Sequence, residues 1–116
     1  MASLPGQYAE PAGCILLAWD KERPVGSVAV RPTSMPGICE MKRLYLRESW
    51  RGGGIGRRLA EDCLSFAFDA GYAKMRLDTE RRLETAIRMY RELGFKEIGR
   101  YHENPIEDML YLEKEL

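Results

Sequence analysis

The chain has 116 residues, of which 45% are hydrophobic and 31% are charged, a composition typical of one soluble globular domain with a single core. Its 18 basic and 18 acidic residues cancel, so no net field favours a nucleic-acid or membrane partner. The longest apolar run, at 14–19, is far too short to span a bilayer, and no signal-peptide pattern opens the chain.

The cysteines indicate the compartment. Cys14, Cys39 and Cys63 are odd in number and far apart, a pattern that fits neither a disulfide framework nor a metal site. We therefore expect reduced core cysteines, no bound metal and a cytoplasmic location.

The first half of the chain predicts strands. Residues 1–13 contain repeated proline and glycine and predict an irregular segment. Alternating apolar residues then predict strands at 14–19 and 25–31, which the polar turn 20–24 joins into a hairpin. A longer strand is expected at 38–47 after a proline- and glycine-containing loop.

The second half predicts two helices, each followed by strand. Apolar residues at helical spacing indicate helices at about 55–70 and 82–93, and Gly71 and Gly94 are placed to end them. On the first helix the expected core face consists of Ile55, Leu59, Cys63, Phe66 and Ala70. Further strands are expected at 71–79, 95–99 and 108–116.

The order of these elements determines the fold class. Strand, helix and strand in the middle of the chain predict a parallel pair with a right-handed crossover. The early hairpin and the late strands add antiparallel neighbours. We therefore expect a single α/β domain over residues 1–116, built on a mixed sheet.

The stretch "WRGGGIGRRLAEDC", residues 50–63, predicts a binding site. Three consecutive glycines are costly at the start of a helix, but they let a ligand reach the backbone. There the first N–H groups and the helix dipole attract an anion. Arg51, Arg57 and Arg58 add positive charge around the same turn, so a phosphate ligand is expected, most simply a pyrophosphate.

Three alternatives to this interpretation differ in strength. A P-loop is disfavoured, because Gly56 is followed by arginines instead of Lys-Ser/Thr. A dinucleotide fingerprint is matched only loosely, although Asp78 ends the next strand; the hairpin before the turn also argues against a doubly wound sheet. A tight connection that binds no ligand stays open.

Several segments together resemble the GNAT-type N-acetyltransferases. "RGGGIG" matches the signature R/Q-x-x-G-x-G/A, with Arg51, Gly54 and Gly56 at the signature positions. "CEMKRLYL" resembles the strand before that loop, "AIRMYRELGF" resembles the family's A-x-x-x-Y-x-x-x-G-F segment, and "GRYHENP" resembles a substrate-side loop. The resemblance covers roughly residues 13–116, in the right order and spacing.

The resemblance implies the acyl-CoA N-acyltransferase fold, a mostly antiparallel sheet whose central parallel pair splays to admit acetyl-CoA. Acetyl-CoA would be the acyl-donor co-substrate, its pyrophosphate on the loop amides and its pantetheine arm along the preceding strand. A backbone N–H there would polarise the thioester carbonyl. The implied cofactor-binding residues are Leu44, Tyr45, Leu46, Arg51, Gly52, Gly53, Gly54, Ile55, Gly56 and Arg57.

The same resemblance implies two catalytic residues. Tyr90 matches the tyrosine that protonates the departing thiolate, and Glu40 matches the carboxylate that deprotonates the incoming ammonium, sometimes through water. Each has a structural alternative. Tyr90 lies on an apolar helix face and could be a core tyrosine, whereas Glu40 shares a strand face with Lys42 and could form a structural ion pair.

Two departures from the family pattern stand out. The usual strand and helices before the hairpin are lacking from this sequence, so we expect an N-terminally shortened member: a natural minimal version, a fragment, or a protein in which another subunit covers the gap. Leu64 and Phe68 form a second apolar helix face that could meet a partner, and we expect a homodimer. Where many members have an asparagine, this chain has Leu83, which leaves more of the chemistry to Tyr90.

We therefore expect an acetyl-CoA-dependent N-acetyltransferase that transfers the acetyl group to a small-molecule amine by direct attack, without an acyl-enzyme. The alternatives are a catalytically impaired acyl-CoA-binding module and a domain that binds another phosphate ligand. The loop before the last strand sets Arg100 against Glu103, Glu107 and Asp108. These carboxylates favour a cationic acceptor.

Overall fold

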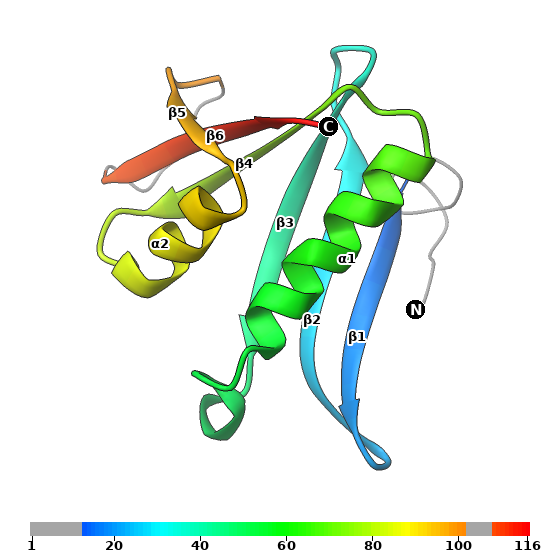
Figure 1. Cartoon of the computed structure of the whole chain (residues 1–116), viewed down its shortest axis with the longest axis vertical. Helices are drawn as coiled ribbons and strands as arrows, with labels where there is room; N and C mark the ends of the chain where they lie inside the picture. The colour runs from blue at the N-terminus through cyan, green and yellow to red at the C-terminus, as the bar shows by residue number, and fades with distance from the viewer. Residues whose placement is uncertain (1–12, 102–107) are drawn as a thin grey trace.

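The computed structural model describes residues 13–101 and 108–116 (Figure 1). In chain order its elements are β1 (Cys14–Asp20), β2 (Arg23–Pro32), β3 (Ile38–Leu46), the 3-10 turn η2 (Glu48–Trp50), α1 (Ile55–Asp69), β4 (Lys74–Glu80), α2 (Glu84–Glu92), β5 (Lys96–Ile98) and β6 (Met109–Glu115). Every predicted helix and strand is present. The largest differences in bounds are that β4 begins at Lys74 and that α2 is shorter at both ends.

The strands form one sheet with the order β1-β2-β3-β4-β6-β5. Only β3 and β4 run parallel, and every other pair is antiparallel. Helix α1 makes the crossover between β3 and β4, as a parallel connection requires. The expected mixed, mostly antiparallel α/β fold is confirmed.

The parallel pair opens into a fork, as expected. β3 pairs with β4 only from Ile38 to Glu40, opposite Lys74 to Arg76. Beyond this point β4 stays paired with β6 along its whole length, while β3 continues beside β2. Figure 1 shows the two strands diverging, with α2 beside the gap.

A bulge accompanies the fork. The register between β2 and β3 shifts between Ser27 and Ala29, opposite Arg43, whose φ is 58°. A positive φ is uncommon outside glycine, and an extra residue in one strand bends it. The bulge therefore bends β3 just beyond its last pairing with β4.

Helix α1 covers one face of the sheet. Its buried residues are Leu59, Ala60, Cys63 and Ala67, which join the core formed by Val28, Met41, Met75, Leu77 and other strand residues. The expected core face was partly wrong, because Ala70 is exposed. The small alanines at 60 and 67 face the sheet instead and allow the helix to approach closely.

The three cysteines are buried, as expected for core residues, and none of them forms a disulfide. Leu64 on α1 packs partly against the core, whereas the Phe68 side chain is 65% exposed. Within the described residues, neither helix is long and apolar enough to cross a membrane.

Candidate active site

The turn between β3 and α1 has a backbone that only glycine adopts readily. Gly52 and Gly54 have φ values of 83° and 89°, which for other residues would be strained. A Cβ placed on either would meet no atom within 4 Å. The outer side of this turn is therefore open, and its backbone is accessible to a ligand.

The N-terminus of α1 presents unused hydrogen-bond donors beside that turn. The first helical hydrogen bond runs from the Arg58 N–H to the Gly54 carbonyl at 3.1 Å. Within the described part of the chain, the N–H groups of Ile55, Gly56 and Arg57 have no acceptor, and α1 has neither a side-chain cap nor an acidic residue in its first turn. Three donors and the helix dipole therefore favour an anion here.

The arginines around the turn are engaged in different ways. The Nε of Arg51 donates to the Leu46 carbonyl at 3.0 Å, and its guanidinium lies 5.8 Å from the centre of the Tyr45 ring. The Nη1 of Arg57 donates to Glu92 on α2 at 2.9 Å. Arg51 thus holds the loop to the end of β3, and Arg57 links the two helices. Their roles in binding a cofactor stay predictions.

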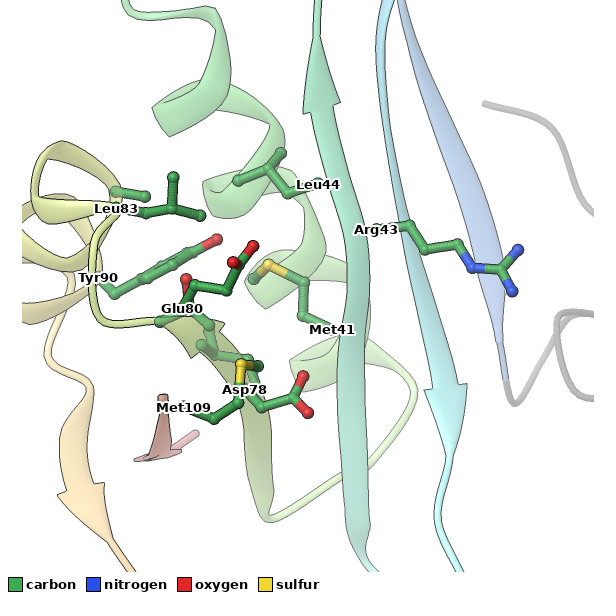
Figure 2. Close-up of a pocket in the computed structure, with 11 residues that line it drawn as sticks. Met41, Arg43, Leu44, Asp78, Glu80, Leu83, Tyr90 and Met109 are labelled. Atoms are coloured by element: carbon green, nitrogen blue, oxygen red, sulfur yellow. The ribbon is translucent and has the colours of Figure 1, made fainter. Parts of the chain in front are cut away.

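A cleft of about 260 Å³ opens between the two branches of the fork and α2 (Figure 2). Its lining residues are Met41, Arg43, Leu44, Leu77, Asp78, Thr79, Glu80, Leu83, Ala86, Tyr90 and Met109. Because β3 has left β4, the strand edge at Met41 to Leu44 faces this cleft instead of a neighbouring strand. A ligand in the cleft can pair with that edge as a strand would.

Tyr90 reaches the cleft from α2 and has no internal hydrogen-bond partner. The residue is 6% exposed, its ring stacks edge-on against Phe95 at 5.8 Å, and its hydroxyl points into the cleft in Figure 2. No other described residue forms a hydrogen bond with that hydroxyl. Burial raises the pKa of Tyr90 to about 12, so the group remains a protonated donor at neutral pH.

Leu83 lies immediately before α2, at its N-cap position, and borders the cleft beside Tyr90 (Figure 2). Its apolar side chain offers no hydrogen bond to a ligand. Leu44 also lines the cleft, whereas Tyr45 and Leu46 are absent from its lining. Tyr45 is instead more than half exposed.

A second pocket, of about 340 Å³, lies on the sheet face opposite α1. It is lined by Arg31, Pro32, Thr33, Ser34, Met35, Glu40, Arg76 and Tyr101. Successive strand residues point to opposite faces, and the neighbours of Glu40, Cys39 and Met41, belong to the core under α1. This alternation places Glu40 and Tyr90 on different faces of the sheet.

Glu40 is the centre of a buried polar network. The residue is 2% exposed. Its Oε1 accepts from Arg31, with Nε at 2.9 Å and Nη2 at 2.7 Å, and its Oε2 accepts from the Tyr101 hydroxyl at 2.7 Å. The expected contact with Lys42 exists at 3.4 Å. The structural ion pair is therefore real, and a catalytic role for Glu40 stays a prediction.

Sequence reasoning missed Arg31, Tyr101 and Arg76 as neighbours of Glu40. Arg31 lies directly opposite Glu40 in the β2–β3 register, so a register drawn from the hairpin could have found it. Tyr101 is 61 residues away from Glu40 in the chain and no local signal identifies it. Burial, followed by the hydrogen bond to Glu40, raises the pKa of Tyr101 well above its usual value.

The fork brings the two pockets close together. Glu40 is the last β3 residue paired with β4, and the next residue, Met41, already lines the cleft of Tyr90. Lys42 connects the pockets through charge, because its Nζ is 3.4 Å from Glu40 and 3.5 Å from Asp78, a cleft residue. Two groups able to handle protons therefore flank one gap in the sheet.

The acidic loop that was expected to favour a cationic acceptor is described only in part. Glu103 and Glu107 lie outside the described residues, as does His102. Asp108 is described, and its carboxylate lies 3.5 Å from Arg81. The described walls of the second pocket are supplied by other residues.

Comparisons with known proteins agree with this geometry. Residues 2–95 match the model of the acetyltransferase (GNAT) family. An uncharacterized N-acetyltransferase of Schizosaccharomyces pombe is 40% identical over 111 residues, 95% of this chain and 68% of that protein. N-acetyltransferase 8B of Homo sapiens is 35% identical over 105 residues, 85% of this chain but only 46% of that protein. The structure of a Bacillus subtilis acetyltransferase in complex with CoA has a TM-score of 0.77 and 21% identity, covering 92% of this chain and 79% of that one.

Proposed function

The chain belongs to the GNAT acetyltransferase family, and from this we propose that it is an acetyl-CoA-dependent N-acetyltransferase acting on the amine of a small molecule. The observation that carries the proposal is the buried Tyr90 hydroxyl, which lacks a partner among the described residues and points into the cleft at the fork. A buried donor without an acceptor is costly, and a bound ligand removes that cost.

The chain's own groups fit acetyl-CoA along its length. The N–H groups of Ile55, Gly56 and Arg57 suit the pyrophosphate, and the open side of Gly52 to Gly54 lets it approach. The exposed edge of β3 at Leu44 suits the amide groups of the pantetheine arm. The arm would then end in the cleft, beside the hydroxyl of Tyr90.

The chemistry is divided between the two faces of the sheet. Bound acetyl-CoA supplies an acetyl thioester, whose C–S bond breaks as the acceptor nitrogen forms a C–N bond to the carbonyl carbon. Tyr90 donates its hydroxyl proton to the departing sulfur and regains one from solvent. Glu40 receives the proton that the acceptor nitrogen loses, through a water molecule where its oxygens are occupied by Arg31 and Tyr101.

Direct attack on the thioester is favoured over an acyl-enzyme. A cysteine nucleophile must ionise and be accessible. Cys14, Cys39 and Cys63 are all buried. Burial raises the pKa of Cys39 to about 12 and also raises that of Cys63. No cysteine is therefore activated beside the cleft.

The size of the second pocket supports a small acceptor. Its volume of about 340 Å³ is at the lower end of the range for small-molecule sites. The alternative is a module that binds acyl-CoA without turnover, which the apolar Leu83 beside Tyr90 would favour.

Calorimetric titration with acetyl-CoA tests the first step, with ATP and NAD as control ligands. We expect saturable binding of acetyl-CoA alone. Release of the CoA thiol, followed with a chromogenic thiol reagent over a panel of primary amines, then separates enzyme from binding module. Binding without thiol release for any amine would favour the module, and equal binding of ATP would contradict the acyl-CoA assignment.

We also propose that the protein is cytoplasmic and that it self-associates. Phe68, on the outer face of α1, would contribute to the contact between copies, because its large apolar side chain is 65% exposed. Light scattering coupled to size exclusion is expected to give a dimer, which Phe68→Glu weakens. A monomer at micromolar concentration would contradict the proposed association.

A further inference from the structure

The second pocket presents positive charge to its contents. Its one lining carboxylate is more shielded from solvent than the arginine paired with it. The Glu40 side chain is 3% exposed against 31% for Arg31. Among the lining residues, two arginines stand against one carboxylate. This excess of positive charge in the lining favours a ligand with a negatively charged group.

Arg76 is the lining residue best placed to receive that charge. Its Nε donates to Glu113 at 2.7 Å, and its guanidinium lies 5.3 Å from the centre of the Tyr101 ring. On the pocket side, its Nη1 contacts only the Met35 sulfur, at 3.7 Å, among the described residues. A thioether is a weak acceptor, whereas guanidinium groups form strong paired hydrogen bonds with carboxylates.

We propose that the acceptor of this N-acetyltransferase is an α-amino acid whose carboxylate is bound by Arg76; this inference rests on the proposed function. Arg76 and Glu40 are register partners on adjacent strands, which lie about 4.8 Å apart, and both line the same pocket. A carboxylate on Arg76 therefore directs the neighbouring amine of the same molecule toward Glu40 and the fork.

Part of the pocket wall is apolar and favours an apolar amino-acid side chain. Met35 is 50% exposed at the wall, and Pro32 and the Tyr101 ring line the same pocket. An exposed apolar wall gains by covering. A simple cationic amine would lie near two guanidinium groups and offer them no hydrogen-bond acceptor. The described pocket therefore favours a zwitterion over the cationic acceptor that the acidic loop suggested.

Matched acceptors test the proposal directly. Alanine, leucine, methionine and phenylalanine are each compared with their carboxamides, which keep the amine and side chain but lack the charge. With saturating acetyl-CoA, kcat/KM is measured by thiol release. We expect the best amino acid to exceed its amide by about tenfold or more, the range of a hydrogen bond to a charged group.

Variants assign the preference to Arg76. Arg76→Gln is expected to reduce the ratio of acid to amide to about one, and calorimetric titration with acetyl-CoA checks that the variant still binds the acyl donor. Arg88→Gln, at an exposed arginine of α2, is the matched control and keeps the ratio. If Arg76→Gln does not fold, Arg76→Lys keeps the charge beside Glu113 but loses paired hydrogen bonding, and it should lower the ratio partially.

The outcomes separate the two levels of the proposal. Amines acetylated without preference for the carboxylate, or with amides preferred, would overturn the amino-acid acceptor and leave the acetyltransferase intact. A carboxylate preference that survives in both Arg76 variants would also overturn it. Failure to bind acetyl-CoA, or to acetylate any amine, would overturn the proposed function and this inference together.

Discussion

The two pockets at the fork hold their reactive groups by opposite means. In the cleft under α2, Tyr90 is surrounded by Met41, Leu44 and Leu83, and its hydroxyl has no partner among the described residues. On the other face, both oxygens of Glu40 accept hydrogen bonds and two cations lie beside it. The Tyr90 site keeps its hydroxyl neutral by desolvation, whereas the Glu40 site surrounds its carboxyl group with hydrogen-bond donors and cations.

This difference indicates how each residue is coupled to stability. The hydroxyl of Tyr90 makes no hydrogen bond with the residues that the structure describes, so its chemistry can be removed without breaking a contact among them. Glu40, on β3, accepts hydrogen bonds from Arg31 on β2 and from Tyr101. A substitution of Glu40 therefore changes the stability of the fold together with the chemistry. The following substitutions exploit this contrast.

Replacing Tyr90 with phenylalanine should have the largest effect on rate. We expect kcat to fall by about 10²–10⁴-fold because the general acid is lost. The free energy of unfolding should change by less than about 1 kcal/mol, since no internal hydrogen bond is removed. Thiol release and urea denaturation measure the two quantities. Tyr72→Phe is the control, and a loss of unfolding free energy as large as the rise in the activation barrier would contradict the contrast.

Replacing Glu40 with glutamine should affect both quantities. Glu40→Gln takes from Arg31 and Lys42 the carboxylate that they share, although Lys42 keeps its ion pair with Asp78. Breaking a buried ion pair costs about 3–5 kcal/mol. We expect a loss of stability on this scale together with a large loss of kcat. Urea denaturation and thiol release at a temperature where the variant is folded measure these effects. An unchanged stability would show that the network contributes little.

A substitution at Gly54 tests the glycine turn as the proposed pyrophosphate site. Alanine at a φ of 89° should cost about 1–2 kcal/mol of stability, and its methyl group should lower the affinity for acetyl-CoA by roughly tenfold. Gly71, with a φ of 91° and equally open surroundings, is a matched control. Gly71→Ala should show the strain alone. Equal affinities for the two variants would argue against the turn as the pyrophosphate site.

The smallest expected effect lies in the acid stability of the polar face. The hydrogen bond from Arg76 holds the pKa of Glu113 below its usual value of 4.5. A lowered pKa stabilises the fold above about pH 4.5, and this contribution is lost as the pH falls through the lowered value. The unmodified protein should therefore lose about 1 kcal/mol more stability than Glu113→Gln as the pH falls below about 4.5.

Thermal unfolding as a function of pH measures this contribution of Glu113. Glu97→Gln is the control, because Glu97 forms an exposed pair with Arg81 at 3.5 Å, and exposed pairs contribute little. If Glu97→Gln reduces the loss of thermal stability at acid pH as much as Glu113→Gln does, the effect comes from the change in net charge and not from the contact with Arg76.

The amino-acid sequence by itself determined the elements, the mixed sheet, the glycine turn and the family. These features depend on residues close together in the chain: apolar periodicity for α1, positive-φ glycines at 52 and 54, and the motif that contains Tyr90. They could be predicted because neighbouring residues settle local backbone geometry.

Only the tertiary structure decided what surrounds Glu40. Tyr101 is 61 residues away from it, and Arg76, its neighbour across the fork, bonds with Glu113, 37 residues further along the chain. The sequence suggested Lys42 as the charged partner, whereas the ion pair with Arg31 is shorter, at 2.7 Å against 3.4 Å. Such contacts depend on strand register and on where β3 leaves β4, and these are set by the packing of the whole sheet.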